Sequence, residues 1–492
     1  MQESVMNLFN NKVALTTVQT SRYPNKVPFD PAEKYPEYTG KGLDPDNKVY
    51  AAIRESLFCL GLDSENYNTV QWNPFGKFVK PGMQVFIKPN TCTDVHENGG
   101  NILSAIIHAS VLRPVLDYVC IALKGSGKII IGDSQLIHGR FDRAMVESQI
   151  EDLLKWYSTE TKISIECFDL RTVRGHRTYL YGKWGRKNVK QDPRGYRFVN
   201  LGDRSYFKGI DPKRLRVSIS SYKNMIKHHS GGKHEYLFPQ SLLDSDIVIS
   251  IPKLKTHRRT AITLAIKNFM GIPAWKDSLP HFTTGSVEEG GDQYIHPSIR
   301  KKICTVLHDQ IQTSPFIPVK FVCALTKKLV WNSHFIWPFK DDVYEAMWQG
   351  NDTVWRTLLD LNRAVFFADR EGKIQETQQR GYFCLIDGII GGEGDGPLSP
   401  DPVYSGTILA GFNPVAVDAV ATTHMGFNIN KIRLVQKALE DTQPPCELFR
   451  GSRNDISVIY NEKVLSDSFN WVICWFHILG YENTNICSNF IL

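Results

Sequence analysis

The chain has 492 residues, of which 42% are hydrophobic and 22% are charged. This length predicts two or three folding units, and the apolar content excludes a mostly disordered protein. The formal net charge of +7 indicates anionic partners but makes nucleic acid unlikely, because nucleic-acid-binding proteins usually show a denser basic stripe.

The ten cysteines are scattered along the chain, and no two of them form a Cys-x-x-Cys pair. This spacing does not support a ferredoxin-type iron–sulfur cluster or a zinc ribbon. Several cysteines lie inside apolar runs, where cysteine behaves as a small core residue. We therefore expect a protein of a reducing compartment, the cytoplasm.

The sequence shows no secretory signal and no run of roughly 20 apolar residues that would span a membrane. Residues 316–339 and 469–480 come closest to such a run. Each of them either docks peripherally on a membrane or a partner, or packs against the main core. Packing against the core is the commoner outcome for segments of this length.

The chain is predicted to begin with an extended arm over residues 1–45, which is followed by an α/β core over residues 46–427. The core starts with an amphipathic helix after Asn47. A strand at 85–87, a crossover helix over 102–123 and a strand at 129–131 then form a βαβ unit.

Two insertions are predicted in the core, at about 171–235 and 275–345. The first is basic and aromatic, and we expect short strands with a solvated face; nucleic-acid binding is the less favoured alternative. Residues 428–492 are predicted to form a C-terminal appendage. The remaining core elements are predicted strands at 247–251, 384–386 and 405–410 and helices at 260–270, 352–367 and 415–425.

Four of the predicted strands are short apolar runs that end abruptly in polar or charged residues: 85–87, 129–131, 247–251 and 384–386. Such runs are typical of parallel strands that are buried on both faces. In open α/β sheets, ligands bind beyond the carboxyl ends of the strands. We therefore predict an α/β fold, a mostly parallel sheet flanked by helices, whose polar strand ends share one cleft.

Lys253, Lys255 and His257 follow the third strand at a period of two, which places them on one side of an extended segment. A solvated edge with splayed lysines is one interpretation. We favour anion binding, because such a cationic cluster after a buried strand is costly without a counter-charge. His257 is the predicted general acid/base, since imidazole titrates near neutrality, and Lys255 is predicted to act beside it.

Lys267 and Asn268 lie near the end of the following helix, where Lys267 either complements the helix dipole or binds the ligand. Lys88 and Asn90 follow the first strand and are predicted to bind the same ligand, as are Asn268 and Ser134.

Carboxylates stand at two other strand ends, Asp133 with Ser134 and Asp387 with Gly388. Converging carboxylates favour a divalent cation such as Mg²⁺, so Asp133 and Asp387 are the predicted metal ligands and alternative proton-transfer groups. Helix capping is an equally weighted interpretation of Asp133 and Ser134.

The glycine-rich stretch 388–397 is predicted to be a loop whose Gly394 and Gly396 let the backbone approach the ligand. Asp418 interrupts an apolar helix and therefore needs a partner, which is either a helix cap, a salt bridge or the ligand.

In chain order these motifs resemble the uncharacterised family catalogued as domain of unknown function 362. The resemblance extends over roughly residues 80–426 and rests on 87–90, 132–134, 252–257, 265–271, 386–389, 394–397, 410–411 and 414–419. Many members carry a ferredoxin-like iron–sulfur module, which the cysteine spacing here does not match. Some longer members are encoded near surface-polysaccharide genes. A more distant likeness in layout is to the lactate racemase family, whose nickel-pincer cofactor motif is not evident here.

The sequence therefore predicts an enzyme that binds a phosphorylated or carboxylated small molecule at the strand ends. The predicted chemistry is that of an isomerase or transferase linked to surface polysaccharide metabolism. Two alternatives stay open: a non-catalytic scaffold of envelope polysaccharide assembly, and a metal- or iron–sulfur-dependent redox protein.

Overall fold

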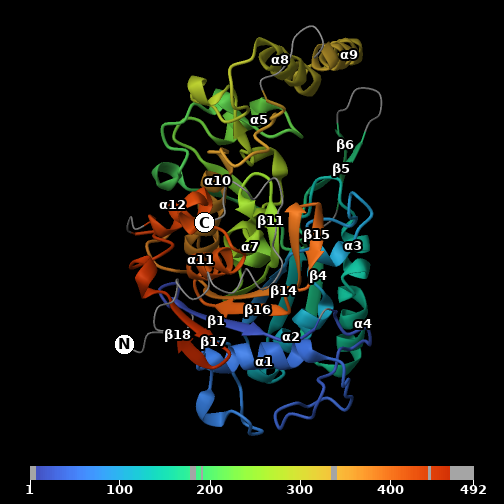
Figure 1. Cartoon of the computed structure of the whole chain (residues 1–492), viewed down its shortest axis with the longest axis vertical. Helices are drawn as coiled ribbons and strands as arrows, with labels where there is room; N and C mark the ends of the chain where they lie inside the picture. Colours follow the sequence, from blue (N-terminus) through green and yellow to red (C-terminus); the bar gives the residue numbers. More distant parts are fainter. Residues whose placement is uncertain are drawn as a thin grey trace.

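The computed structural model describes residues 7–20, 22–177, 184–189, 192–333, 341–441 and 445–465. Within these residues a mixed, mostly parallel sheet of 12 strands forms the centre, and helices flank it (Figure 1). The predicted α/β class is confirmed. The sheet runs in the order β18 (Lys463–Leu465), β17 (Ser457–Tyr460), β1 (Lys12–Thr17), β16 (Thr407–Gly411), β14 (Gly381–Asp395), β10 (Ile247–Ile251), β2 (Gln84–Pro89), β3 (Lys128–Asp133) and β4 (Ser164–Asp169). In addition, β11 (Lys253–His257) and β15 (Ser399–Val403) pair with β14, and β12 (Ala261–Ile262) pairs with β11.

The parallel strands β14, β10, β2 and β3 are those that the four apolar runs predict, and β4 pairs in parallel with β3 beside them. Their side chains alternate between two cores, and both cores are apolar. Phe86 packs into the core on one face of the sheet, while Ile87 packs into the core on the other. Because both faces are buried, the runs are continuously hydrophobic, and the polar residues that follow them share one edge of the sheet.

Helices from different parts of the chain cover the two faces. One core takes in α1 (Lys48–Cys59), α2 (Ala109–Leu123) and α4 (Ile150–Glu160). The other takes in α7 (Leu264–Asn268), α10 (Val354–Phe367), α11 (Pro414–His424) and α12 (Arg433–Leu439). The shorter helices are α3 (Phe141–Glu147) and α6 (Gln240–Leu243).

Two of the predicted helices are shorter than expected. Residues 102–108 hold only a 3-10 turn, Ile102–Ser104, and α2 begins at Ala109 with His108 as its cap. α7 has five residues instead of eleven, because Ala261 and Ile262 pair with β11 as the strand β12 before the helix starts.

Both ends of the described chain join the central sheet, which the sequence did not predict. β1 comes from the predicted arm and lies between β16 and β17. β17 and β18 come from the predicted appendage and extend the same sheet. The residues up to 465 therefore form part of the core and are not a separate appendage; residues 466–492 lie outside the described residues.

The first insertion consists of short strands, as predicted: β5 (Val173–Arg177), β6 (Trp184–Asn188), β7 (Tyr196–Asn200), β8 (Leu215–Arg216) and β9 (Glu235–Pro239), with the helix α5 (Tyr222–His228). Its first basic residue, Arg171, is buried and pairs with Asp169, so it is not part of a basic surface. The second insertion holds β13 (Phe282–Thr283), α8 (Ile299–Thr313) and α9 (Ile317–Asn332).

Asn47 ties the N-terminal segment to the core. Its buried amide donates to the carbonyls of Phe29 and Asp30 at 2.9 and 2.8 Å, and its oxygen caps α1 through the amides of Val49 and Tyr50.

Asn47→Ala is expected to lower the free energy of unfolding by about 2–4 kcal/mol, because it removes a helix cap and leaves two buried carbonyls without donors. Urea unfolding measures this change. Asn430→Ala, at an exposed position, is the matched control and should change stability by less than about 0.5 kcal/mol. Equal effects of the two substitutions would contradict this role of Asn47.

Candidate functional site

The edge formed by the strand ends holds a buried ion pair between Lys88 of β2 and Asp133 of β3. Their Nζ and Oδ1 atoms are 2.9 Å apart, and each side chain is at most 2% exposed. Thr91 donates to the other carboxylate oxygen through both its amide and its hydroxyl. Asn268 of α7 accepts from Lys88 and donates to the Lys88 carbonyl, so this pair faces α7.

A second ion pair joins Lys253 of β11 to Asp387 of β14 at 3.0 Å, and both side chains are fully buried. Tyr23 donates to Asp387 at 2.6 Å, and the amide of His108, at the start of α2, also donates to it. The ring of Tyr23 stacks on that of His108. Burial lowers the pKa of Lys253 to about 8 even though Asp387 opposes this effect.

These two pairs bear on the predicted metal site. The carboxylate oxygens of Asp133 and Asp387 already accept hydrogen bonds from lysines and from other donors of the protein. No group of three or more potential metal ligands lies among the described residues. The metal and proton-transfer roles of the two aspartates stay predictions, and the ion pairs account for both residues without them.

The glycine-rich stretch is not a loop. β14 continues through Asp395 and pairs with β15 and β11, so the prediction of a ligand-facing loop over 388–397 is wrong over most of its length. The glycines are needed because neighbouring chain segments pack against them. A Cβ on Gly392 would lie 2.5 Å from the carbonyl oxygen of Ser104, and one on Gly396 would collide with that of Thr256.

Gly394 has a positive φ of +70°, and its carbonyl accepts hydrogen bonds from Thr256 and from the amide of Gly396. Gly394 and Gly396 thus hold β11 in place. Their predicted contact with a ligand stays a prediction.

Asp418 caps α7. Its carboxylate accepts hydrogen bonds from the amides of Ala265 and Ile266 at 2.6 and 3.0 Å, which matches the cap alternative. Ser134 likewise has a partner within the protein, the carbonyl of Pro273 at 2.7 Å. Asp418 therefore positions the helix that carries Lys267 and Asn268.

Lys255 differs from Lys88 and Lys253 because it has no carboxylate partner among the described residues. Its buried ammonium donates to the carbonyls of Ala105 at 2.6 Å and Pro397 at 2.9 Å, and it lies 3.2 Å from the Cys92 sulfur. Since the side chain is fully buried, the alternative of a solvated edge is wrong for this residue.

Lys267 is the second cation without a counter-charge. In the part of the chain that the structure describes, its partly buried ammonium makes no hydrogen bond and no ion pair. Burial lowers its pKa to about 7, and the nearby charges of Lys255 and Arg259 contribute to this shift. The group that titrates near neutrality is therefore a lysine.

His257 does not titrate near neutrality, so the reason given for its role as general acid/base is wrong. Burial and the charges of Lys267, Arg259 and Lys255 hold its pKa well below the usual range, and the ring is neutral. Its Nδ1 accepts from the amide of Arg259 at 3.1 Å, which places the proton on Nε2. Nε2–H has no partner among the described residues.

The same edge holds functional candidates that the sequence analysis missed. His281 donates through Nδ1 to the Leu279 carbonyl at 2.8 Å, which leaves a lone pair on Nε2; burial, followed by the charge of Arg259, lowers its pKa to about 3. Lys276 donates to the Met270 carbonyl, and burial lowers its pKa to about 7.

Cys92 interacts electrostatically with Lys88 and Lys267 and contacts Lys255, so all three lysines lie in its neighbourhood. The sequence offered a signal that the analysis did not use, since Cys92 stands two residues after Asn90 at a strand end. Asn90 is itself buried, and its Oδ1 has no hydrogen-bond partner among the described residues. We call Lys255, Lys267, His257, His281, Arg259 and Lys276 the cationic cluster.

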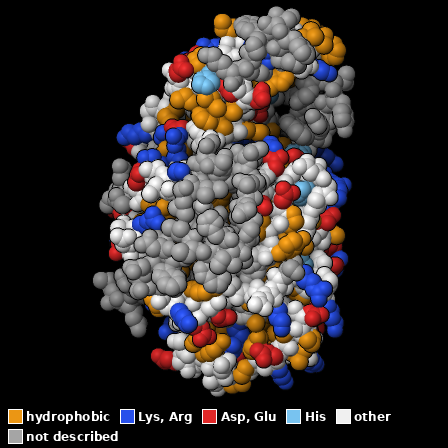
Figure 2. Space-filling view, in the orientation of Figure 1, with side chains coloured by type: hydrophobic (Ala, Val, Ile, Leu, Met, Phe, Trp, Pro, Cys, Tyr) orange, Lys and Arg blue, Asp and Glu red, His pale blue; other side chains and the backbone are white. Residues whose placement is uncertain are grey.

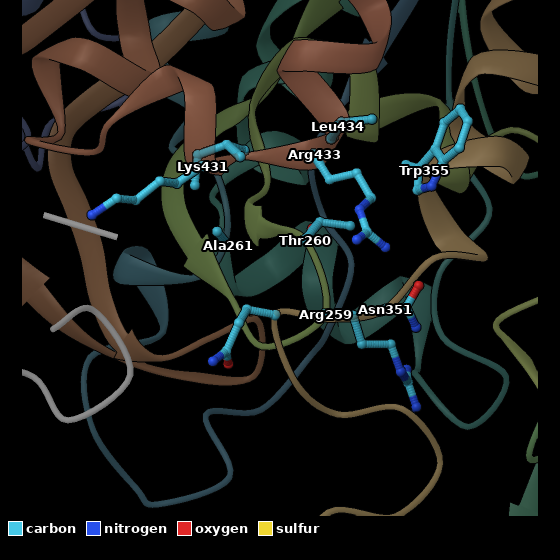
Figure 3. A pocket seen from close by; sticks show the side chains of 10 residues that line it. Arg259, Thr260, Ala261, Asn351, Trp355, Lys431, Arg433 and Leu434 are labelled. Atoms are coloured by element: carbon cyan, nitrogen blue, oxygen red, sulfur yellow. The ribbon is translucent and has the colours of Figure 1, made fainter. Parts of the chain in front are cut away.

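A small pocket opens beside the cationic cluster at the turn between β11 and β12 (Figure 3). Arg433 extends towards Thr260, whereas Arg259 extends away from Arg433 and donates to the Glu345 carbonyl. Arg433 pairs with Asp352 at 3.0 Å, so this guanidinium is neutralised. The pocket shares Arg259 with the cluster.

Residues 209–423 match the model of the family described as Domain of unknown function (DUF362). The resemblance to this family is confirmed over these residues. The matched range includes Lys255, His257 and Lys267 of the cationic cluster. Lys88 and Cys92 precede this range, which begins at residue 209. Searches of curated proteins and of solved structures found no match.

Asp387→Asn is expected to lower the free energy of unfolding by about 3–5 kcal/mol, because it leaves the buried Lys253 ammonium without its counter-charge. Urea unfolding measures the loss. The double variant Lys253→Met/Asp387→Leu should recover most of it, since it removes both charges together. An unchanged stability of Asp387→Asn would contradict a structural role for the pair.

Proposed function

We propose that this protein binds an anionic small molecule, phosphorylated or carboxylated, at the cationic cluster and transfers a proton to or from it. The observation that carries the proposal is the presence of Lys255, which is fully buried, and Lys267, which is partly buried, with no carboxylate partner for either ammonium group among the described residues. The two other strand-end lysines, Lys88 and Lys253, each have an aspartate.

The energetics of burial support an anion as the missing partner. Moving a charged group out of water is unfavourable unless an opposite charge or hydrogen bonds replace the lost hydration. For Lys255, two backbone carbonyl dipoles partly replace the lost hydration of the ammonium group. For Lys267 the described residues supply nothing equivalent, and its lowered pKa reflects that deficit. A bound phosphate or carboxylate would stabilise both ammonium groups at once.

The neighbouring histidines suit the recognition of such an anion. Both rings are neutral, and each has a defined tautomer because its Nδ1 is engaged by the backbone. His257 presents Nε2–H as a donor, and His281 presents Nε2 as an acceptor. The His257 donor suits an unprotonated oxygen of the ligand, and the His281 acceptor suits a hydroxyl group, so the two rings distinguish these groups.

Lys267 is the group best suited to proton transfer. A pKa of about 7 makes both its ammonium and its amine accessible at physiological pH, which is what general acid/base catalysis requires. Proton transfer on an anionic substrate is the elementary step of many isomerases and also accompanies many transfer reactions. The link to surface polysaccharide metabolism stays a prediction.

Lys267→Gln is expected to weaken the binding of an anionic probe about 10- to 100-fold, the effect of removing one charge-assisted hydrogen bond. Isothermal titration calorimetry with inorganic pyrophosphate and with citrate measures this loss for one phosphorylated and one carboxylated probe. Lys34→Gln, at an exposed position outside the cluster, is the matched control. Equal affinities for the two variants, or no binding of either probe or of any co-purifying anion to the wild type, would contradict the proposal.

Anion affinity is also expected to fall as the pH rises above about 7. Only the ammonium form of Lys267 attracts the anion, so binding above its free pKa requires proton uptake, and the association constant falls by up to about tenfold per pH unit. Below pH 7 this group contributes no pH dependence. His257 and His281 stay neutral over the same range.

Titrations in buffers of different ionisation enthalpy measure the proton uptake directly. Lys267→Gln should reduce both the uptake and the slope, and Lys276 accounts for any remainder, since its pKa is also about 7. A slope that is identical in the wild type and the variant would assign the titration to another group.

A further inference from the structure

The hairpin of α8 and α9 exposes apolar side chains and buries cationic ones, which is the reverse of the rest of the protein. It lies at one end of the molecule, far from the central sheet (Figure 1). The alternative that residues 316–339 pack against the main core is wrong for the described part of this segment, because the only buried residue of α9 is Lys320. Residues 334–340 lie outside the described residues.

Large apolar side chains are concentrated on the outside of the hairpin. Of the 19 exposed large hydrophobic residues in the described chain, 10 lie between residues 299 and 332. Figure 2 shows apolar side chains exposed at this end of the molecule. The ten residues, with their exposed fractions, are Ile299 (64%), Ile303 (37%), Val306 (60%), Phe316 (66%), Ile317 (62%), Val319 (41%), Phe321 (48%), Val322 (60%), Leu325 (52%) and Leu329 (64%).

These residues form stripes on the helices. Residues 317, 321, 325 and 329 of α9 follow one another at intervals of four, and residues 299, 303 and 306 of α8 follow at intervals of four and three. Such spacing places each set on one face of its helix. The hairpin therefore presents continuous apolar faces rather than scattered single side chains.

Three of the six cationic residues of the hairpin are buried instead. Arg300 and Lys301 are each 1% exposed, and Lys320 is 7% exposed. Arg300 donates to the carbonyl of Trp331, at the end of α9, and Lys301 pairs with Asp341 at 2.5 Å. Burying cations while exposing aliphatic and aromatic side chains is unfavourable in water, and it becomes favourable when the outer face is in contact with an apolar phase.

We propose that the α8–α9 hairpin docks the protein on the surface of a membrane that contains anionic lipids. Residues 299–332 contain six Lys or Arg residues and one acidic residue, Asp309, a difference of five positive charges. Asp309 is itself paired with Arg216 at 2.8 Å. Exposed Lys328 lies on α9 beside its apolar residues, where lipid phosphates and carboxylates complement it, whereas exposed Lys302 pairs with Glu289.

The same charge makes a second copy of this chain a poorer partner. Two hairpins face to face would place like charges opposite each other, and nothing in α9 is acidic. A lipid headgroup layer supplies the negative charge, and the acyl region beneath it receives the apolar side chains.

The hairpin is suited to lie on a membrane and not to cross it. Its helices have 15 and 16 residues, which corresponds to roughly 22–24 Å, shorter than the hydrocarbon core of about 30 Å. In the described chain no helix has the length and apolar character of a membrane span. Insertion of one apolar face to the depth of the headgroup boundary requires neither the length nor the all-round apolar character of a membrane span.

Vesicle flotation of the full chain tests the proposal. We expect the protein to float with vesicles of 70% phosphatidylcholine and 30% phosphatidylserine and to stay unbound with pure phosphatidylcholine, with binding that weakens at high salt. The triple variant Phe316→Asn/Val322→Asn/Leu329→Asn should lower the partition coefficient by about 100-fold or more, because three apolar contacts are lost at sites that do not contribute to the core.

The matched control is Val70→Asn/Val146→Asn/Val464→Asn, which removes three equally exposed apolar residues outside the hairpin and should float like the wild type. Thermal unfolding of both triple variants verifies that each is folded. Lys267→Gln should also float normally, so a failure of membrane binding is distinguishable from a failure of the anion site. No flotation of the wild type would overturn the proposal, as would a dimer in light scattering that only the hairpin variant dissociates.

Discussion

Buried positive charge that lacks an equal negative charge is the constraint on which the strand-end site depends. The parallel strands bring several lysines to one edge of the sheet, where the surrounding helices exclude water. An ammonium group in such a place needs a counter-charge, a set of dipoles or a lowered pKa. Lys88 and Lys253 each have an aspartate as counter-charge. Lys255 has carbonyl dipoles, and Lys267 has a lowered pKa.

This difference separates the lysines that the ion pairs account for from those that we propose to bind an anion. The pairs Lys88–Asp133 and Lys253–Asp387 fix the ends of β2, β3, β11 and β14. Asp418 holds the start of α7, so that Lys267 projects from a fixed helix. The result is a rigid frame around a small region of net positive charge, which is the arrangement that allows strong binding of an anion without reorganisation of the site.

The sequence predicts the sheet well, because buried parallel strands have a distinctive pattern of apolar, β-branched residues that ends in polar ones. It does not predict β1 and β17, whose pairing depends on contacts over several hundred residues, or β18, which joins the sheet only through β17. The glycines of β14 were misinterpreted for a related reason. A glycine-rich sequence indicates that another group approaches the backbone closely. It does not indicate whether that group is a ligand or the protein's own strand β11.

For the candidate site, the residue types were predictable and their roles were not. Charges that neutralise one another, such as Lys253 and Asp387, are 134 residues apart, and no local pattern pairs them. The pKa of His257 was misjudged because its value depends on burial and on cations from other segments. His281 and Cys92 were missed because each stands in a segment whose position near Lys267 only the fold determines.

A crystal soaked in selenate would test the central claim most directly, because the anomalous signal of selenium locates an oxyanion independently of any model of the protein. The account predicts an anomalous peak within hydrogen-bond distance of the Lys267 ammonium and His257 Nε2, and no such peak in crystals of Lys267→Gln. Selenate bound only at exposed lysines, with Lys267 paired to a carboxylate of the protein, would contradict it.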